Sequence, residues 1–579
     1  MSTRFWLLLV ALVGSLSNSA RAQFQTDFLM ESDPKITGSG FVRVVSPRYF
    51  QLWKQALSSP EQDLHRRAAE TIARAASMQT EGLDQFREPL QKVLLAESSL
   101  PAVRYSAARA LAAINAQDEA ANLWDVAQKQ GIDLRQLVEL TIATWDYRPA
   151  REVWMARMKD SRTRHRDMLL AVRCLATVKE TAALPRLREF VMDQSQPADL
   201  RLESATAAGS LTDQGLEAEA TTLLKDTRKA AVVSRVCAVR LLNRHTSPAA
   251  QALLLTGAKD AESSVMAAAM SRLIEIDPEL MLPLAESALA HVDANVRRAG
   301  IETYALKPTP ERMTAVGKLL DDQNPTLRNK VRKEFVRLAA MPELNDSIRA
   351  AGMRELAGTS WRSQEQAALL LAELDHKPAA PRLVELLEVE RPEVMVTSAW
   401  ALRKLAVPET LPAMFDKANR QTTFRLGNDW RFELDLQVAH LFEAFSVLKY
   451  REAEPLLRKH VPKELKLGEY SRSAAIWSLG KFYENNVDED LAKQLIARAA
   501  DSASIPTEMV RVREMSAVTL GRMKAMSQLP RLRELMGPSP ELSQEASCMR
   551  WAIMQMTGET LPEPTAVKMG FGFSFLEPQ

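Results

Sequence analysis

Residues 101–111 read Pro-Ala-Val-Arg-Tyr-Ser-Ala-Ala-Arg-Ala-Leu, and this phrase recurs in diverged form along most of the chain. With Arg104 as the reference position, fifteen copies align at spacings of 31 to 41 residues. The reference positions are His65, Arg104, Arg135, Met168, Arg201, Arg235, Met266, Arg297, Arg328, Gln364, Met395, Asp435, Arg472, Arg513 and Gln544. A period of this length is typical of solenoids built from stacked helix pairs.

Two further columns of the alignment support this register. Three residues after the reference, twelve of fifteen units have Ala, Ser or Gly and the other three have Val. Seven residues after it, fourteen of fifteen units have a large apolar residue, and Ala208 is the exception. Offsets of three and seven lie on one helix face, so each unit is predicted to turn a small-then-large stripe toward the core.

Length and composition favour the same class of fold. A chain of 579 residues with 46% hydrophobic residues is too long for one compact core, so it needs several domains or an elongated array. Only 20 residues are Gly and only 6% are aromatic, which favours helices over a sheet-rich fold. The sequence therefore predicts an all-α protein, an α-solenoid of about fifteen helix pairs.

The pattern Val-Arg-x-x-Ala-Ala-x-Ala-Leu resembles the second helix of HEAT repeats, especially the short bacterial HEAT-like units. The resemblance covers roughly residues 61–557 and implies an armadillo-type superhelix. In that family the Arg commonly bonds an Asp of an adjacent turn and forms a ladder along the stack. Here only about half of the units have Arg at this position, so any ladder is broken, and we interpret Arg104, Arg201, Arg297 and Arg328 as structural.

The first 22 residues are typical of a secretory signal peptide. Arg4 precedes an apolar run at 6–13, and Ala20-Arg21-Ala22 places small residues at −3 and −1 of a cut before Gln23. The run is too short to span a bilayer securely, and no later stretch is long and apolar enough to do so. We expect a protein of the periplasm or the secreted space without a transmembrane segment once the signal is cleaved.

The chain is accordingly divided into a signal peptide (1–22), an N-terminal extension (23–60), the HEAT-like solenoid (61–557) and a Pro/Phe-rich C-terminal tail (558–579). The extension contains a strand-like run at 41–45. In the tail, Phe alternates with other residues from Phe571, and we expect this tail to cap the last repeat, the alternative being a peptide recognised by a partner. The tail is also similar to the ends of exported HEAT-repeat proteins of planctomycete-like bacteria.

Charge and cysteine content exclude two further classes of protein. The sequence has 75 Lys and Arg against 73 Asp and Glu, and loss of Arg4 and Arg21 with the signal would leave 75 − 2 = 73 against 73. A nucleic-acid-binding protein needs a positive excess, so we expect no nucleic-acid partner. The cysteines Cys174, Cys237 and Cys548 are too few for a disulfide framework and are predicted to be buried free thiols.

Insertions in the repeat array are the predicted sites of recognition, because loops at one edge of a solenoid commonly carry it. The segment 419–431 is rich in Arg and aromatic residues and lacks a clear helical period. Its candidate partner-binding residues are Arg420, Phe424, Arg425, Trp430 and Arg431, since Arg and Trp are favoured interface anchors. The alternative is a loop folded back on the stack with Phe424 and Trp430 buried.

Two other insertions carry weaker signals. The run 485–490 (Asn-Asn-Val-Asp-Glu-Asp) resembles alternating calcium ligands, but the turn Gly of an EF-hand is missing, so capping of the next helix explains it better. The stretch 501–507 is expected to be a plain Ser/Pro loop.

No catalytic, metal-binding or cofactor-binding motif is recognisable in the sequence. The seven histidines form no metal-ligand spacing, and nucleophile elbows, phosphate-binding loops and Cys-x-x-Cys are absent. We therefore predict a non-catalytic scaffold or adaptor of the cell envelope or secreted space. It would bind a protein or peptide on the concave helical surface. Two alternatives stay open: a phycobilin-lyase-like HEAT protein, and a structural protein of the envelope.

Overall fold

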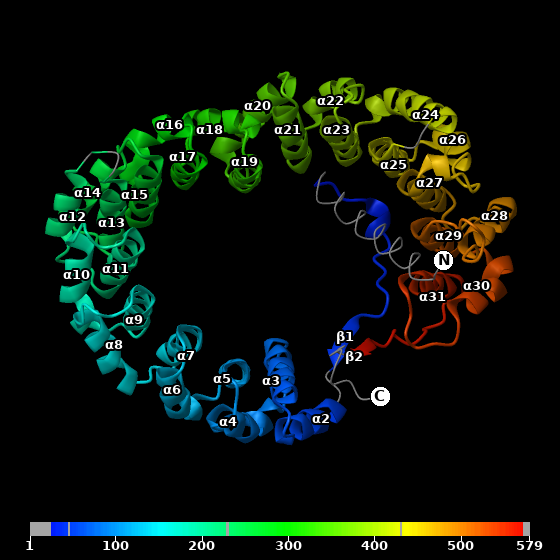
Figure 1. Ribbon diagram of the computed structural model, residues 1–579. Coiled ribbons are helices and arrows are strands. Elements are labelled where there is room, and N and C mark those ends of the chain that lie inside the picture. Colours follow the sequence, from blue (N-terminus) through cyan, green and yellow to red (C-terminus); the bar gives the residue numbers. More distant parts are fainter. Residues whose placement is uncertain (1–24, 45–46, 227, 229–230, 429–430, 571–579) are drawn as a thin grey trace. The chain divides into compact units, whose positions relative to one another are not determined.

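The computed structural model describes residues 25–44, 47–226, 228, 231–428 and 431–570. These residues contain fifteen pairs of α-helices and one two-stranded sheet, of β1 (Phe41–Val44) and β2 (Val567–Gly570). The predicted α-solenoid of HEAT-like helix pairs is confirmed, and the small sheet, short 3-10 helices and an N-terminal segment accompany it (Figure 1). No described helix combines the length and apolar character needed to cross a bilayer.

The helix pairs divide into two compact units, and the division falls within α17 (Ala294–Leu306). Unit 2 comprises Val42–Thr303 and Lys568–Gln579. Its other helices are α2 (Pro47–Ser58), α3 (Gln62–Ser77), α4 (Arg87–Leu95), α5 (Pro101–Ala113), α6 (Ala120–Lys129), α7 (Ile132–Thr144), α8 (Pro149–Lys159), α9 (His165–Thr177), α10 (Leu184–Met192), α11 (Ala198–Leu211), α12 (Glu217–Leu224), α13 (Val232–Leu241), α14 (Pro248–Gly257), α15 (Ser263–Ile276) and α16 (Leu282–Leu289).

Unit 1 comprises Met1–Phe41 and Tyr304–Val567. Its helices are α18 (Pro310–Gly317), α19 (Pro325–Leu338), α20 (Pro342–Ala357), α21 (Trp361–Glu373), α22 (Ala380–Leu386), α23 (Pro392–Leu405), α24 (Leu411–Gly427), α25 (Phe432–Val447), α26 (Glu454–Arg458), α27 (Glu469–Phe482), α28 (Glu489–Ala499), α29 (Val510–Met523), α30 (Leu529–Met536) and α31 (Gln544–Thr557). In both units every reference position of the sequence repeat falls on an odd-numbered helix, which is the second helix of its pair.

A left-handed residue ends many of the second helices. Asn115 (φ 56°) follows α5 and Asp375 (φ 47°) follows α21, each eleven residues after its reference position. The next amide then bonds back across the last turn, as Ala116 N does to Leu111 O at 3.0 Å. This backbone arrangement satisfies carbonyls that the helix end would otherwise leave unpaired, and it turns the chain tightly into the next pair.

The core follows the two columns of the sequence repeat. All fifteen residues of the small column are buried, and so are fourteen of the large column, with Trp551 half-buried. Gly300 shows why the column is small: a Cβ there would lie 3.0 Å from Ala285 O of the preceding helix. The register predicted from the sequence is therefore the register of the packed core.

The arginines at the reference position bind the turns of the stack. Arg104 donates to Ala96 O at 2.7 Å, and Arg328 donates to Asp322 O at 2.8 Å, each in the turn before its own helix. Arg235 also reaches Asp260 of the next turn at 2.7 Å. These arginines fasten turns within the stack, which agrees with their structural interpretation.

The predicted strand-like run 41–45 forms β1, which pairs with β2 from the tail. Before β2, Leu561 packs against the apolar core of unit 1, and Arg550 donates to Leu561 O at 2.7 Å and to Pro562 O at 2.8 Å. This part of the tail contacts the last helix, α31. The predicted signal peptide (1–22) and residues 571–579, with the alternating Phe, lie outside the described residues.

Two expectations for the insertions and cysteines hold. Asp488 caps α28 by accepting from Leu491 N at 2.9 Å, so helix capping explains the acidic run 485–490. Cys174, Cys237 and Cys548 are free and buried, and burial raises the pKa of the Cys237 thiol to about 11.

Candidate protein-binding face

The candidate segment 419–431 is helical over most of its length, which corrects the expectation of a loop. Residues up to Gly427 continue α24, because Arg420, Thr423 and Phe424 recur on one exposed side and no Pro or Gly interrupts residues 413–426. Arg420 lies on this outer face and forms an ion pair with Glu388 at 2.5 Å. The helix places Arg420 and Phe424, one turn apart, on its exposed side and Arg425 on its buried side.

Arg425 is a buried structural residue and not a surface anchor. Its guanidinium donates to Leu467 O at 2.6 Å, Ser471 Oγ at 3.1 Å and Asp435 Oδ1 at 3.2 Å, and its side chain has no exposed surface. Burial lowers the pKa of Arg425 despite the opposing charge of Asp435. The sequence does not show that Arg425 is buried while its neighbours are exposed, because the segment has no clear helical period.

The remaining candidates are at the surface or outside the structure. Phe424 is 44% exposed, so it is not folded back into the stack. Arg431 pairs with Glu433 next to the start of α25. Trp430 lies outside the described residues.

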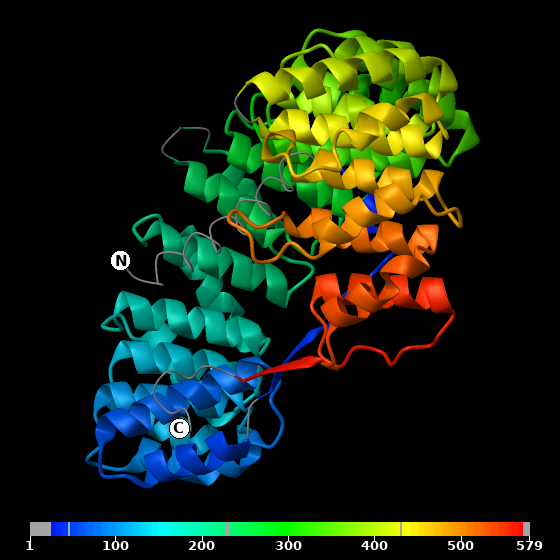
Figure 2. The ribbon, with the colours of Figure 1, turned by 90° about the vertical axis from the view of Figure 1, so that its right-hand side faces the viewer.

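A different surface of unit 1 holds a peptide, and that peptide is the chain's own N-terminal segment, residues 25–39. This segment contains one 3-10 turn, η1 (Leu29–Glu31), and is otherwise irregular. It contacts residues of the second helices α19, α23, α25, α27, α29 and α31, and we call the side of the second helices that it covers the second-helix face. Figures 1 and 2 show the blue segment passing along the yellow, orange and red helices toward β1.

Asp27 makes the first acidic contact between the N-terminal segment and the second-helix face. Asp27 Oδ1 accepts from Trp400 Nε1 at 2.5 Å and lies 2.9 Å from Arg403 Nη2. Arg403 also pairs with the fully buried Glu443, whose other oxygen accepts from Met30 N at 2.9 Å. Burial raises the pKa of the Asp27 carboxyl, but the Trp400 hydrogen bond and the Arg403 charge outweigh it and hold that pKa below its ordinary value.

Aromatic stacking supplies the apolar anchor. The Phe28 ring lies parallel to the His440 imidazole, with centroids 4.2 Å apart and an interplanar angle of 8°. The Tyr470 ring also contacts Phe28, with centroids 5.1 Å apart and an interplanar angle of 39°. Phe28 and Met30 are the two buried side chains of the segment, and both belong to the apolar core of unit 1.

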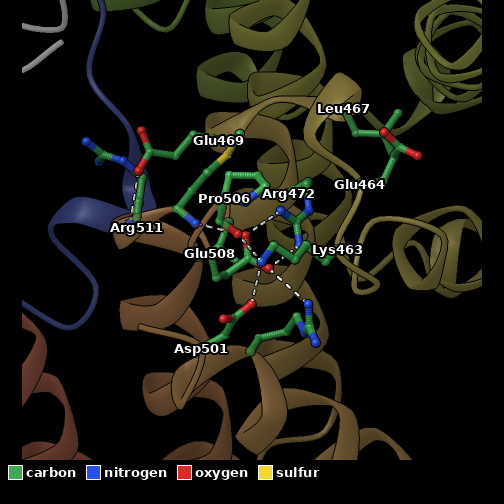
Figure 3. Close-up of polar contacts among 12 residues, drawn as sticks. Lys463, Glu464, Leu467, Glu469, Arg472, Asp501, Pro506, Glu508 and Arg511 are labelled. Atoms are coloured by element: carbon green, nitrogen blue, oxygen red, sulfur yellow. Dashed lines mark hydrogen bonds and ion pairs between the residues drawn. The ribbon is translucent and has the colours of Figure 1, made fainter. Parts of the chain in front are cut away.

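The second half of the segment is held by cations and an indole. Glu31 forms an ion pair with Arg511, whose side chain extends toward the blue segment in Figure 3. The backbone oxygen of Asp33 accepts from Trp477 Nε1 at 2.5 Å and from Arg522 Nη2 at 2.7 Å. Arg522 also binds the Asp33 carboxylate at 2.9 Å.

Backbone hydrogen bonds end the contact at α31. Gln544 accepts from Gly38 N at 2.7 Å and donates to Ile36 O at 2.8 Å. Ser39 N donates to Leu542 O at 2.8 Å. The second-helix face therefore recognises both the side chains and the main chain of a linear peptide.

A buried network supports this part of the face from behind. Arg472 on α27 makes two bonds to Glu508, at 2.6 and 2.8 Å, and both side chains are fully buried (Figure 3). Lys463 binds Asp501 at 2.6 Å and thereby holds the 501–507 loop. Glu469 accepts from Arg511 N at 3.0 Å at the start of α29. These contacts fix the relative position of α27 and α29, which carry Trp477 and Arg522.

The insertions in the sequence do not point to this face, but the repeat itself carries a signal for it. The fifth residue after the reference position points away from the helix-pair core. In unit 2 it is an exposed charge at Arg109 and Arg173, whereas in α23, α25 and α27 it is the buried Trp400, His440 and Trp477. A helix that carries aromatic residues on its outward side needs cover there, so this column in α23, α25 and α27 indicates a covering element.

Unit 2 has a hollow of its own, between α3, α5 and α7. Its volume is about 950 Å³, and Tyr105, Leu134, Leu137 and Leu140 contribute apolar surface to it. Nothing in the described residues shows what fills it. Among the described residues, no group of three or more His, Cys, Asp or Glu side chains is placed to hold a metal ion.

No protein-family model matches the chain, and no curated protein matches it. Solved structures are similar to it at low identity. A crystal structure of importin beta is 14% identical over 88% of this chain and 72% of its own, with a TM-score of 0.49. Kap95p in complex with RanGDP is 13% identical over 89% and 72%, with a TM-score of 0.45. The karyopherin Kap121p bound to the extreme C-terminus of Cdc14p is 14% identical over 85% and 55%, with a TM-score of 0.41. The assignment of this chain to the HEAT-like α-solenoid fold therefore rests on its own repeat and helix pairs.

Proposed function

We propose that this chain is a non-catalytic scaffold of the periplasmic or secreted space that binds another protein along the second-helix face of unit 1. One observation carries the proposal: this face already holds a linear segment of polypeptide from α19 to α31. Solenoids present extended surfaces of this kind to their partners. The signal-like residues 1–22 support the location outside the cytoplasm.

Site-specific photo-cross-linking in the native organism tests the binding face. A photoreactive residue at Lys404 would lie on α23 beside Trp400, whose ring is 5.0 Å from Lys404 Nζ. The matched control is Glu385, which is exposed on the first helix α22. We expect one reproducible protein adduct at Lys404 and none of that mass at Glu385. Equal labelling at both positions would contradict binding on this face, and a regular ladder of self-cross-links would favour the envelope structural role.

The location is tested separately. Fractionation should recover the chain outside the cytoplasm, and N-terminal sequencing of the purified protein should start at Gln23. A cytoplasmic protein that retains Met1 would refute export while leaving the binding face untouched.

A further inference from the structure

We infer that residues 25–39 are an internal ligand of the second-helix face, and that the partner protein displaces them with a linear acidic segment built on the same pattern. That pattern is Asp-Phe, followed by an acid four and an acid six residues after the Asp, as in Asp27, Phe28, Glu31 and Asp33. The inference rests on the proposed function and names the class of partner it requires.

Charge complementarity defines the acidic positions. Each acid of the segment meets a cation from the face: Arg403 of α23 binds Asp27, and Arg511 of α29 binds Glu31. Asp33 lies between Arg522 of α29 and Lys481 of α27, whose Nζ is 3.2 Å away. Because these cations stand on three separate helices, their spacing selects the spacing of the acids along the peptide.

The aromatic position is defined by shape. His440 and Tyr470 form a slot for a flat ring, and Phe28 fills it with only 5% of its surface exposed. Buried aromatic anchors dominate the binding energy of such contacts. A partner segment without an aromatic residue directly after its first acid would leave this slot unfilled.

The second-helix face loses hydrogen-bond acceptors when it is empty. Exchange of the internal segment for a partner peptide is therefore favoured over simple release of the segment. The indole N–H groups of Trp400 and Trp477 both donate to the segment, and the Arg522 guanidinium bonds Asp33. Buried donors that lose their acceptors are costly. A displacing peptide must therefore supply acceptors at the same places.

Residues 25–39 can dissociate from the second-helix face without disrupting the helix pairs. The segment adds no helix to the stack, whose fifteen described pairs are formed without it. Of its fifteen residues only Phe28 and Met30 are buried, while Thr26, Ile36 and the others are half-buried or exposed. Release of the segment thus removes two anchors and leaves the helix-pair core in place.

Binding of a labelled synthetic peptide with the sequence of residues 25–39 to the full chain tests the inference. In the wild-type chain the internal segment competes with the peptide. The apparent association constant of the peptide therefore equals its intrinsic value multiplied by the fraction of chains whose face is free. Phe28→Ala in the chain weakens the internal segment, and we expect the peptide to bind this variant about tenfold tighter or more. Phe41→Ala is the matched control, because Phe41 is 70% exposed and lies beyond the contact, and it should bind the peptide as the wild type does.

Charge reversal separates recognition from a general effect on folding. Arg522→Glu added to the Phe28→Ala chain should weaken binding about tenfold, since it opposes Asp33. A peptide with Asp33→Lys should restore binding to that chain and to no other. Equal affinity in wild-type and Phe28→Ala chains, absence of this rescue, or loss of the helical circular-dichroism signal in Phe28→Ala would each overturn the inference.

Two further outcomes identify the occupant. Light scattering that shows dimers formed through exchanged N-terminal segments would assign the face to a second copy of the chain and overturn the partner assignment. If the peptide binds as expected but no protein cross-links at Lys404, the proposed function fails while the internal ligand stands. If a protein cross-links at Lys404 and the peptide does not compete with it, the proposed function stands and this inference fails.

Discussion

Removal of the Phe28 ring should detach the N-terminal segment without unfolding the helix pairs. Phe28 is 5% exposed and stacks on His440 at 4.2 Å. Burial of a Phe side chain contributes about 1.5–3 kcal/mol, and a stacked aromatic pair adds about 0.5–1.5 kcal/mol. Phe28→Ala should therefore weaken docking of the segment by about 3 kcal/mol, which corresponds to roughly a 100-fold change in its open fraction.

Hydrogen exchange followed by mass spectrometry measures this change directly. The Met30 amide is protected by its 2.9 Å bond to Glu443, so peptides covering residues 26–33 report on docking. In Phe28→Ala their protection should fall by about 100-fold, while peptides from α25 and α27 keep theirs. Phe41→Ala should leave the same peptides unchanged.

Two results would refute this account of the segment. Unchanged protection of residues 26–33 in Phe28→Ala would show that the aromatic slot does not hold the segment. An equal loss of protection in α25 and α27 would show that the segment is an integral part of the core.

Three other perturbations follow from buried contacts. Burial lowers the pKa of His440 to about 4, beside Glu443, so the unfolded imidazole gains a proton between its ordinary pKa of about 6.5 and pH 4 while the folded one does not. Stability of unit 1, measured by urea unfolding, should therefore be complete above pH 6.5 and fall by about 3 kcal/mol on acidification to pH 4, and His440→Phe should remove this part of the pH dependence. Arg472→Met removes the two-bond cation partner of the buried Glu508 carboxylate and leaves it only Arg498 at 3.3 Å, so it should cost up to about 3–5 kcal/mol, seen as a lower unfolding midpoint. Gly521→Ala places a Cβ 2.6 Å from the Cα of Ala552 and should cost about 1–3 kcal/mol.

Matched controls isolate each effect. Arg531→Met removes an exposed pair with Glu534 and should change stability by less than about 1 kcal/mol. Gly131→Ala adds a Cβ with nothing within 4 Å and should be close to neutral. His460 is also buried with a lowered pKa, so it contributes equally to wild type and His440→Phe and cancels in their difference. An Arg472→Met protein as stable as wild type would contradict the role of the buried pair, and a tolerated Gly521→Ala would show that α29 and α31 can separate.

The repeat, its register and the core follow from the amino-acid sequence alone. Helical periodicity places residues three and seven positions after each reference on one face, and only small residues allow neighbouring helices to approach, as at Gly300. The free buried cysteines and the cap at Asp488 follow from equally local rules. Each of these features depends on residues close in the sequence or on a pattern repeated many times.

The position of the bound segment depends on contacts between residues that are distant in the sequence. Phe28 meets His440 more than four hundred residues away, and no local pattern encodes such a pairing. The prediction of a loop at 419–431 was wrong because an aromatic, Arg-rich composition does not distinguish a loop from the end of α24. The same composition does not distinguish the buried Arg425 from the exposed Arg420. Composition specifies what a side chain can bind, but its burial and its partners depend on which distant elements pack against it.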